Sequence, residues 1–452
     1  MITKRRILLL LCTLIFLVVA PLSIVYGLGY KYNWQKKEWQ KTGVFFVKSY
    51  PRSSDIFLND KQEKKVTPTQ ITRLLPNSYE VKISKKNYQA WKKNLTIEPQ
   101  LTTFIEDVSL FYTDPEIKLI GAGNFIDFLA HETKPLIALT ENKDNQNSLY
   151  VYQLNGDLKK IYETQKDSLK LLSWSEGGQK LLALNKTSGR YVVINVSGET
   201  AITLPTIVAG WTNLQWDKNN DNFIYGLDQK NNLWRLDISK KITETAAKDE
   251  KVLAYTHRPE GLIIITADPK KPTEAILKIA NNNEFTDLLN LSSNDKYSFK
   301  FPPQQTNIVA LFNETQKQLY LFDLNQEKQP LLVNLTSVNN LNWLDKTRLL
   351  YWNDAELTVF DLATNSKNLI ERTSQKISYG FWHQNGVYAY AVIDKLLKLY
   401  ELDSRDKRNV YEFQNIHLND NNFITTNSQG DTLYFAGRWS DQEAGLYSAV
   451  IQ

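Results

Sequence analysis

The sequence predicts an all-β protein behind an N-terminal transmembrane helix, with a small β-sandwich first and a β-propeller of about eight blades after it. Three observations predict this fold class. An uncharged apolar run opens the chain, aromatic residues make up 12% of its 452 residues, and an all-β unit recurs about every forty residues after residue 113. Aromatic side chains favour strands. A content of 42% hydrophobic residues leaves room for more than one core.

The apolar run covers residues 7–28 and contains no charged residue. Some twenty residues that rise about 1.5 Å each match a hydrocarbon core of about 30 Å. A backbone that crosses lipid must satisfy its own hydrogen bonds, so we expect a helix. The aromatic side chains that follow predict a belt at one membrane interface: Tyr26, Tyr30, Tyr32 and Trp34.

Three other interpretations of the run compete with a permanent anchor. One of them, a buried core helix, is not expected at the N-terminus beside a basic tip. A cleaved secretory signal would use Ala20, but Pro21 directly after it argues against processing there, and residues 25–27 are a weaker site. A lipoprotein signal on Cys12 would need a small residue where Leu11 stands. The run is also longer than the apolar core of a usual signal. We therefore expect an uncleaved anchor.

Charge sets the expected orientation of this anchor. The basic tip, Lys4, Arg5 and Arg6, favours an N-terminus inside the cell. The other flank is also basic, which weakens this argument without reversing it: Lys31, Lys36, Lys37 and Lys41. We predict a single-pass protein of the cell membrane with the bulk of the chain outside the cytoplasm. Residues 1–30 form the tip and the anchor, and residues 31–42 form a juxtamembrane linker.

The distribution of charge and cysteine limits the function classes. Residues 31–100 carry 15 Lys and Arg against 6 Asp and Glu, whereas the residues after 100 carry 36 against 43. The basic part either serves solubility or is attracted to anionic lipid heads or wall polymer. The only cysteine, Cys12, lies inside the apolar run. The rest of the chain therefore has neither a disulfide nor a cysteine metal site.

Residues 43–112 predict a compact antiparallel β module. Strand signals cover residues 43–47, 55–58 and 79–83, and residues 95–97 are expected to form the last strand. Turn residues separate these segments. Lys61, Lys64 and Lys65 are expected in a solvated turn.

The order of residues in this module resembles the PEGA domain, a small β-sandwich of bacterial and archaeal surface proteins. The matching positions are Ser49 and Pro51, Ser53 and Ser54, Asn59 and Asp60, Thr67 and Pro68, Leu75 to Asn77, and Asn87 and Tyr88. Asn, Asp or Ser stands at several positions where the family has glycine. Because Asn and Asp tolerate φ > 0 best after glycine, the turns can survive. The resemblance implies a binding or spacer module without catalytic residues.

Residues 113–452 carry the repeat. Its clearest copy has an aromatic-bearing strand at 214–216, a polar turn, an apolar strand at 223–227 and a strand at 233–237 that ends in Asp237. A unit of this kind cannot bury its own faces, so neighbouring units must stack around an axis. Eight units end near Leu154, Asn195, Asp237, Ala280, Asp323, Asp361, Asp403 and Ile451. Seven blades with a ring-closing strand remain the alternative.

The repeat is similar to the TolB-type and WD-repeat-like propellers of bacterial envelope proteins. Residues 173–178 are nearest to the first half of the family unit, and residues 319–324 are nearest to the second half. Most copies lack the Pro-Asp-Gly turn of the family. The resemblance implies a propeller fold and says almost nothing about the ligand.

No catalytic, cofactor-binding or metal-binding residue is predicted, and no cofactor. The four histidines, His131, His257, His383 and His417, fall in different repeats without a metal-spaced partner, so we expect structural or surface roles. The chain contains no Gly-x-Ser-x-Gly, no P-loop and no Gly-x-Gly-x-x-Gly.

Two polar stretches and the tryptophans have a structural and a functional interpretation. Residues 142–147 and 217–222 offer oxygens to Ca²⁺, but we expect them to be hairpin turns. The tryptophans either line a sugar- or peptide-binding face or fill the core between blades, and we favour the core: Trp174, Trp211, Trp216, Trp234, Trp343, Trp352, Trp382 and Trp439.

The leading functional prediction is a membrane-anchored extracytoplasmic binding or scaffold protein without enzymatic activity. Its propeller would bind an envelope protein or a cell-wall glycan through loops at a channel mouth, and it would not bind nucleic acid. One alternative is an enzyme acting on a glycoside or polymer with two carboxylates about 5–10 Å apart at a propeller mouth. Another is a structural spacer without a ligand.

Overall fold

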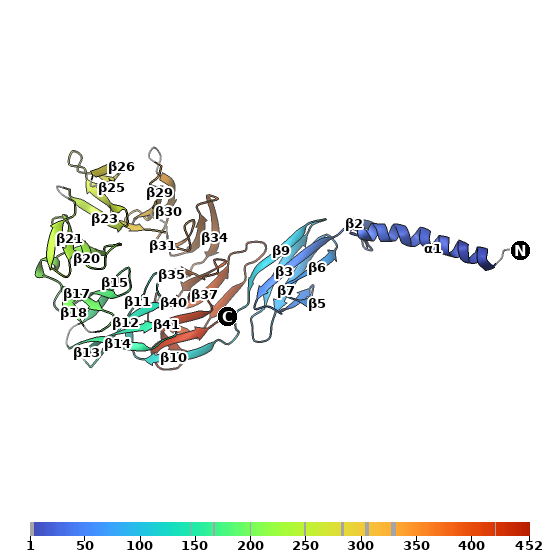
Figure 1. Ribbon diagram of the computed structural model, residues 1–452, viewed down its shortest axis with the longest axis horizontal. Helices are drawn as coiled ribbons and strands as arrows, with labels where there is room; N and C mark the ends of the chain where they lie inside the picture. The colour runs from blue at the N-terminus through green and yellow to red at the C-terminus, as the bar shows by residue number, and fades with distance from the viewer. Residues whose placement is uncertain are drawn as a thin grey trace. The chain divides into compact units, whose positions relative to one another are not determined.

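A computed structural model describes residues 4–144, 146–165, 168–198, 200–247, 250–281, 284–302, 307–326, 331–420 and 422–452. Apart from one N-terminal helix, the described regular structure is almost all β, as the sequence predicts (Figure 1). The chain divides into two compact units. Unit 1 comprises Met1–Glu116, Glu401–Tyr411 and Val450–Gln452, and unit 2 comprises Ile117–Tyr400 and Glu412–Ala449.

Helix α1 (Lys4–Gly27) contains the predicted apolar run. Its stretch Leu8–Gly27 is long and apolar enough to cross a membrane. Most of the large apolar side chains along it are 48–68% exposed, because no protein core covers them. Gly29, at a φ of 82°, follows the end of the helix, where a left-handed residue stops the helical hydrogen-bond ladder.

A hairpin follows α1 where the sequence suggested only a linker. Strand β1 (Tyr30–Asn33) pairs with β2 (Glu38–Lys41). The Asn33 side-chain oxygen accepts the backbone N–H of Gln35 at 3.0 Å and that of Lys36 at 3.2 Å, which closes the turn. The Tyr32 ring makes edge contacts with the rings of Trp34 and Trp39. The sequence did not indicate this hairpin, because two four-residue strands are too short to give a periodic pattern.

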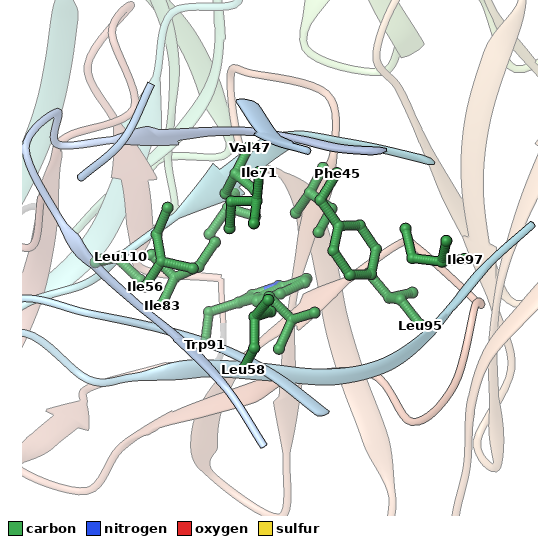
Figure 2. Packing of buried hydrophobic residues seen from close by; sticks show 13 residues of the cluster. Phe45, Val47, Ile56, Leu58, Ile71, Ile83, Trp91, Leu95, Ile97 and Leu110 are labelled. Carbon is green, nitrogen blue, oxygen red and sulfur yellow. The ribbon is translucent and has the colours of Figure 1, made fainter. Parts of the chain in front are cut away.

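The rest of the N-terminal part of unit 1 is a two-sheet β-sandwich. One sheet has the order β6-β3-β9 and the other β5-β4-β7-β8. Their strands are β3 (Gly43–Tyr50), β4 (Asp55–Leu58), β5 (Lys61–Val66), β6 (Thr69–Leu74), β7 (Asn77–Ser84), β8 (Trp91–Ile97) and β9 (Thr102–Ser109). Burial alternates along β3 and β8 because successive side chains of a strand point to opposite faces. Figure 2 shows the resulting core, in which Trp91 and Phe45 lie among aliphatic side chains of both sheets.

Three predictions for this module were wrong. Lys61, Lys64 and Lys65 lie on β5 and not in a turn. This strand is at a sheet edge with almost every residue exposed, so it has no alternation, and its lysines protect the edge from pairing with other chains. Residues 95–97 do not form the last strand, since β9 follows. The module is also not wholly antiparallel, because β9 pairs with β3 in parallel.

Three turn positions of the sandwich at which the PEGA pattern has glycine have the expected left-handed backbone. Ser53, Asp60 and Asn87 have φ values of 58°, 63° and 69°. Asn77, the fourth such position, is not among the residues with positive φ.

We therefore expect Ser53→Gly to raise the free energy of unfolding of unit 1 by about 0.5–1 kcal/mol, because a left-handed conformation strains a residue with a Cβ. Urea unfolding of the full chain, followed by hydrogen exchange in β3 and β4, measures this.

The matched control is Asn77→Gly. We expect it to lower the free energy of unfolding by a similar amount, because glycine gains flexibility in the unfolded chain without relieving strain. It also removes the hydrogen bond that the Asn77 side chain accepts from the Ser78 N–H. Equal effects of the two substitutions would contradict the strain argument.

A buried ionic cluster joins the segment Glu401–Tyr411 of unit 1 to β8. The Lys93 side chain is fully buried, and its Nζ lies 3.2 Å from Glu401 Oε2 and donates to the carbonyl of Asp403 at 2.6 Å. Trp91 Nε1 donates to Glu401 Oε1 at 2.8 Å, and the Asn409 side chain donates to Glu401 Oε2 at 2.9 Å. The buried carboxylate is thus both paired and hydrogen-bonded, as a buried charge must be.

Unit 2 is a series of small antiparallel sheets, each built from strands consecutive in the sequence. The first sheet has β11 (Phe125–Ala130), β12 (Leu136–Lys143), β13 (Gln146–Gln153) and β14 (Leu158–Gln165). The second has β15 (Leu169–Trp174), β16 (Lys180–Asn185), β17 (Arg190–Asn195) and β18 (Ala201–Thr203). The third has β19 (Thr212–Trp216), β20 (Phe223–Leu227), β21 (Leu233–Asp237) and β22 (Ile242–Thr245). A short 3₁₀ helix, η1 (Thr206–Val208), connects the second to the third.

The next four sheets have the same form. They are β23 (Val252–Arg258), β24 (Gly261–Ala267), β25 (Glu274–Asn281) and β26 (Glu284–Ser292); β27 (Tyr297–Lys300), β28 (Ile308–Asn313), β29 (Gln318–Asp323) and β30 (Leu331–Thr336); β31 (Asn340–Trp343), β32 (Arg348–Trp352), β33 (Glu356–Asp361) and β34 (Ser366–Arg372); and β35 (Ile377–Trp382), β36 (Tyr388–Ile393), β37 (Leu396–Glu401) and β38 (Val410–Phe413).

One further sheet combines strands from the two ends of the repeat region. It has the order β10-β42-β41-β39, with β40 also paired to β41. The strands are β10 (Glu116–Ala122), β39 (Ile416–Leu418), β40 (Ile424–Thr426), β41 (Thr432–Trp439) and β42 (Gly445–Val450). The first strand of the repeat region therefore completes the sheet of the last strands.

Buried apolar clusters or other side-chain contacts join each sheet of unit 2 to the next. Leu149 of the first sheet packs with Leu181 of the second, and similar clusters span the following sheets. Trp352 contacts Tyr379 between the sixth and seventh sheets. The Gln384 side chain donates to the Thr426 hydroxyl at 3.4 Å between the seventh sheet and the last. A cluster containing Phe128 of the first sheet and Phe423 of the last closes the cycle, which is the packing pattern of a β-propeller.

The predicted repeat endings coincide, within two residues, with the ends of β13, β17, β21, β25, β29, β33, β37 and β42. These are the third strands of their sheets. The fourth strands were missed, because they are short or half exposed.

Candidate functional site

A cavity of about 510 Å³ lies where the first strands of four consecutive sheets meet. It is lined from β19, β23, β27 and β31, with further residues from β28 and the turns beside it. The residues are Asn213, Gln215, Tyr255, Ser298, Phe299, Lys300, Phe312, Glu314, Lys317, Asn339 and Asn340. We call it the first-strand cavity. Its volume lies in the range of ligand-binding pockets.

A backbone irregularity in β19 accompanies the side-chain amides that line this cavity, those of Asn213 and Gln215. The pairing of β19 with β20 shifts register between Thr212 and Gln215, and Asn213 there has a φ of 54°. Gln215 Nε2 donates to the carbonyl of Tyr255 on the next sheet at 2.9 Å. The Tyr255 hydroxyl in turn donates to the carbonyl of Asn213. These two bonds tie neighbouring first strands together, and bulges of this kind often re-aim side chains at sites.

The Tyr255 phenol stays protonated and can donate a hydrogen bond. Burial raises its pKa well above the usual value. The exposed part of the lining is polar, with Asn213, Lys300 and Lys317 open to solvent. Lys317 Nζ lies 6.0 Å from the centroid of the Phe312 ring, within reach of a cation–π contact. The cavity thus combines amides, cations and aromatic faces.

Among the described residues that line the cavity, Glu314 alone carries a carboxylate. Hydrolysis of a glycoside by the usual route needs two, about 5–10 Å apart. The arrangement can therefore bind a ligand through amide hydrogen bonds and aromatic contacts, but it does not offer that catalytic pair.

Two of the four histidines, His131 and His383, lie in turns that follow first strands, and His257 lies near the end of the first strand β23. His131 Nδ1 accepts the backbone N–H groups of Thr133 and Lys134, and His257 Nδ1 accepts that of Lys218 at 2.9 Å. His383 Nδ1 accepts the N–H of Asn385 at 3.3 Å. Burial lowers the pKa of each of these three imidazoles.

Oxygen acceptors take the same place in other sheets. The side chains of Ser175, Asp217 and Asp345, each just after a first strand, accept backbone N–H groups of the segment that leads into the second strand. The side chain of Asn427, just after β40, accepts that of Gly430. This recurring acceptor was missed in the sequence, although its signal is visible as a polar residue just after the apolar end of a first strand. His417 differs from the other histidines, being exposed on β39.

The two polar stretches fall at hairpins. Residues 217–222 connect β19 to β20, and the buried Asp217 carboxylate lies 3.4 Å from Arg235 Nη2. Asn145, in the stretch 142–147, lies outside the described residues, and its neighbours belong to the β12–β13 hairpin. No group of three or more His, Cys, Asp or Glu side chains is placed to hold a metal in the part of the chain that the structure describes.

The tryptophans lie mainly between sheets. Trp211 and Trp216 belong to the cluster between the second and third sheets. The indole N–H of Trp174 donates to the carbonyl of Leu129, and that of Trp382 to the carbonyl of Asn342, each on the preceding sheet. The first-strand cavity contains none of the tryptophans named in the sequence.

Comparison with known proteins gives a likeness of fold. No family model matches the chain, and no curated protein does. Among solved structures, a chain of the mitotic checkpoint complex is 12% identical with a TM-score of 0.43, covering 76% of this chain and 93% of the other. Sqt1 of Saccharomyces cerevisiae is 12% identical with a TM-score of 0.46, covering 75% and 98%.

A third similar structure is the uncharacterized protein lmo1340 from Listeria monocytogenes EGD-e. It is 11% identical with a TM-score of 0.44, and the match covers 66% of this chain and 97% of the other. With TM-scores below 0.5, these likenesses contribute no functional argument. The sheet order and the cyclic packing of unit 2 therefore remain the basis for its fold.

Proposed function

We propose that this chain is a membrane-anchored extracytoplasmic scaffold that binds a segment of a protein partner in the first-strand cavity. In this proposal α1 is an uncleaved anchor, residues 43–112 are a PEGA-type module, and residues 113–452 form a closed propeller of eight blades. The basic tip before α1 and the large unit after it support the placement outside the cytoplasm. The cyclic packing of the sheets supports the eight blades.

The observation that carries the proposed binding is the amide-rich lining of the cavity. Asn213, Gln215, Asn339 and Asn340 offer the donors and acceptors that a peptide backbone needs. Lys300 and Lys317 outnumber the single carboxylate of Glu314, which favours a segment with an acidic side chain. A glycan of the cell wall is the second candidate, because amides and aromatic faces such as Phe299 also suit hydroxyl-rich ligands.

Site-specific cross-linking in spheroplasts tests the proposal. We expect a photoreactive residue at Asn340 in the full chain to form an adduct with one envelope protein. The same residue at Lys240, in an exposed turn of unit 2, serves as the control site. External protease should remove unit 2 together with the adduct, since both lie outside the cytoplasm.

Charge variants test the role of the cavity in this adduct. Lys300→Ala combined with Lys317→Ala should lower the adduct yield several-fold, whereas the matched pair Lys240→Ala and Lys270→Ala, in exposed turns, should not. An adduct that a muramidase shortens identifies a glycan ligand. Equal labelling at Asn340 and Lys240 would leave only the spacer function, and full protection from external protease would contradict the placement.

A further inference from the structure

Unit 1 has a cavity of its own, of about 770 Å³, at the C-terminal end of α1. Its walls come from the last turns of α1, the β1–β2 hairpin and the β6–β7 connection of the sandwich. Figure 1 shows the hairpin directly at the end of the helix. We call it the juxtamembrane cavity.

The lining of this cavity has a one-sided charge. Lys31, Lys36 and Arg73 are among its residues, and no Asp or Glu is. A cavity with three cations and no carboxylate favours an anion. Phosphate is well matched to such a set, since Lys supplies a point charge and Arg a planar fork of donors.

Contacts within unit 1 hold Arg73 at the helix end. Its guanidinium lies 3.2 Å from the centroid of the Tyr26 ring, and Nη2 donates to the Tyr26 carbonyl at 3.2 Å. Lys31 Nζ donates to the Arg73 carbonyl at 3.4 Å. Arg73 also has a φ of 62°, a conformation that costs energy in a residue with a side chain. These contacts place a cation within one turn of the end of the apolar stretch at Gly27.

Exposed aromatic side chains surround the same cavity. Trp34 is 84% and Trp39 is 49% exposed, and Tyr26 is 61% exposed. Trp and Tyr prefer the headgroup level of a membrane, where an apolar ring and a polar edge are both satisfied. Large rings left open to water in this number are costly for a surface that faces only solvent.

We propose that the juxtamembrane cavity binds the phosphate headgroup of an anionic lipid, with the acyl chains along the apolar face of α1 beside Leu22. The proposal rests on the proposed function in one respect, namely that α1 spans a membrane. The end of the apolar stretch then lies at the depth of the lipid phosphates. Lys31, Lys36 and Arg73 bind the phosphate, and the rings of Trp34 and Trp39 cover the glycerol region.

Lipid retention by the full chain tests this site. The protein is reconstituted in vesicles of phosphatidylcholine with phosphatidylglycerol and then extracted into mild detergent. Native mass spectrometry measures the number of lipid molecules that stay bound to each chain. We expect about one phosphatidylglycerol for each chain. Lys31→Gln combined with Arg73→Gln should lower this retention about tenfold. The matched control, Lys64→Gln with Lys65→Gln, removes two charges from the exposed strand β5 and should retain the lipid.

A second variant guards against loss of folding. Trp34→Ala changes a side chain that is almost wholly exposed, and it should also lower retention several-fold. Equal retention by all variants, or retention of phosphatidylcholine and phosphatidylglycerol alike, overturns the headgroup site. Displacement of the lipid by inorganic phosphate also overturns it, because the site would then take a soluble anion.

Membrane insertion is measured separately in the same vesicles. Resistance of the chain to alkaline carbonate extraction reports on α1 alone. A chain that resists extraction but retains no anionic lipid contradicts only the headgroup site. A chain that is extracted contradicts the anchor, and with it the proposed function.

Discussion

Lys93→Met is expected to lower the free energy of unfolding of unit 1 by about 3–5 kcal/mol. The Lys93 side chain has no exposed surface, and that of Glu401 is 6% exposed. Methionine keeps the volume of the lysine stem but removes the charge, so the Glu401 carboxylate stays buried without its cation. Urea unfolding of the full chain, with hydrogen exchange followed in β7 and β8, measures the loss.

The neighbouring lysine provides the control for this prediction. Lys92 pairs with Glu80 at 2.7 Å, but its side chain is 54% exposed, so Lys92→Met should cost less than about 1 kcal/mol. Adding Glu401→Gln to Lys93→Met should restore part of the loss, because a neutral amide still accepts the hydrogen bond from Trp91. Similar losses for the Lys92 and Lys93 variants would rule out a buried ion pair.

Acidification from pH 7.5 to 5.5 is expected to destabilise unit 2. Burial holds the pKa of His257 and of His383 below the ordinary value of 6.5. The unfolded chain therefore binds more protons than the folded one in this range. Their contribution to stability is complete above about pH 6.5 and is lost as the pH falls, with a slope of up to about 1.4 kcal/mol per pH unit for each imidazole.

The local geometry gives the reason for this sensitivity. Each Nδ1 accepts a backbone N–H, and protonation of that nitrogen would remove the acceptor. The charged groups near His257 partly oppose one another, since Asp217 raises its pKa while Arg235, Lys218 and Arg258 lower it. Near His383, Asp431 acts to raise the pKa, but burial outweighs it.

The variant His383→Asn separates this effect from general acid denaturation. Asparagine keeps an oxygen acceptor for the turn, as Asn427 does in the neighbouring sheet, and it does not titrate. We expect the pH slope of the urea midpoint to fall in this variant and to stay unchanged in His417→Asn, an exposed position. An unchanged slope in His383→Asn would show that its imidazole is not the group responsible.

The sequence was most informative where burial is periodic. The third strands of the repeats end in an apolar-Asp or similar step, so their ends could be placed within two residues. The long apolar run likewise predicted α1. Strands such as β5 and β22 escaped notice because they are exposed on both faces and carry no alternation.

The candidate sites could not be predicted from spacing. Gln215 and Lys300 are far apart in the chain and meet only because the first strands of neighbouring sheets converge. Lys93 and Glu401 are brought together by the fold in the same way, and an isolated lysine on a strand reads as a surface residue. The sequence predicted an aromatic belt from Tyr26 to Trp34. The contact of Arg73 with Tyr26 is visible only in the tertiary structure, because the two residues are far apart in the chain.

The pairing of β10 with β42 in one sheet has a consequence for biosynthesis. The ribosome makes β10 first and β42 last, and at roughly 5–20 residues per second the interval lasts tens of seconds. During that time the sheets of the nascent chain form a row with two unpaired ends, and β10 has no partner. Such open strand edges are sites of aggregation, so we expect the unfinished chain to need a chaperone that covers these edges until β42 arrives.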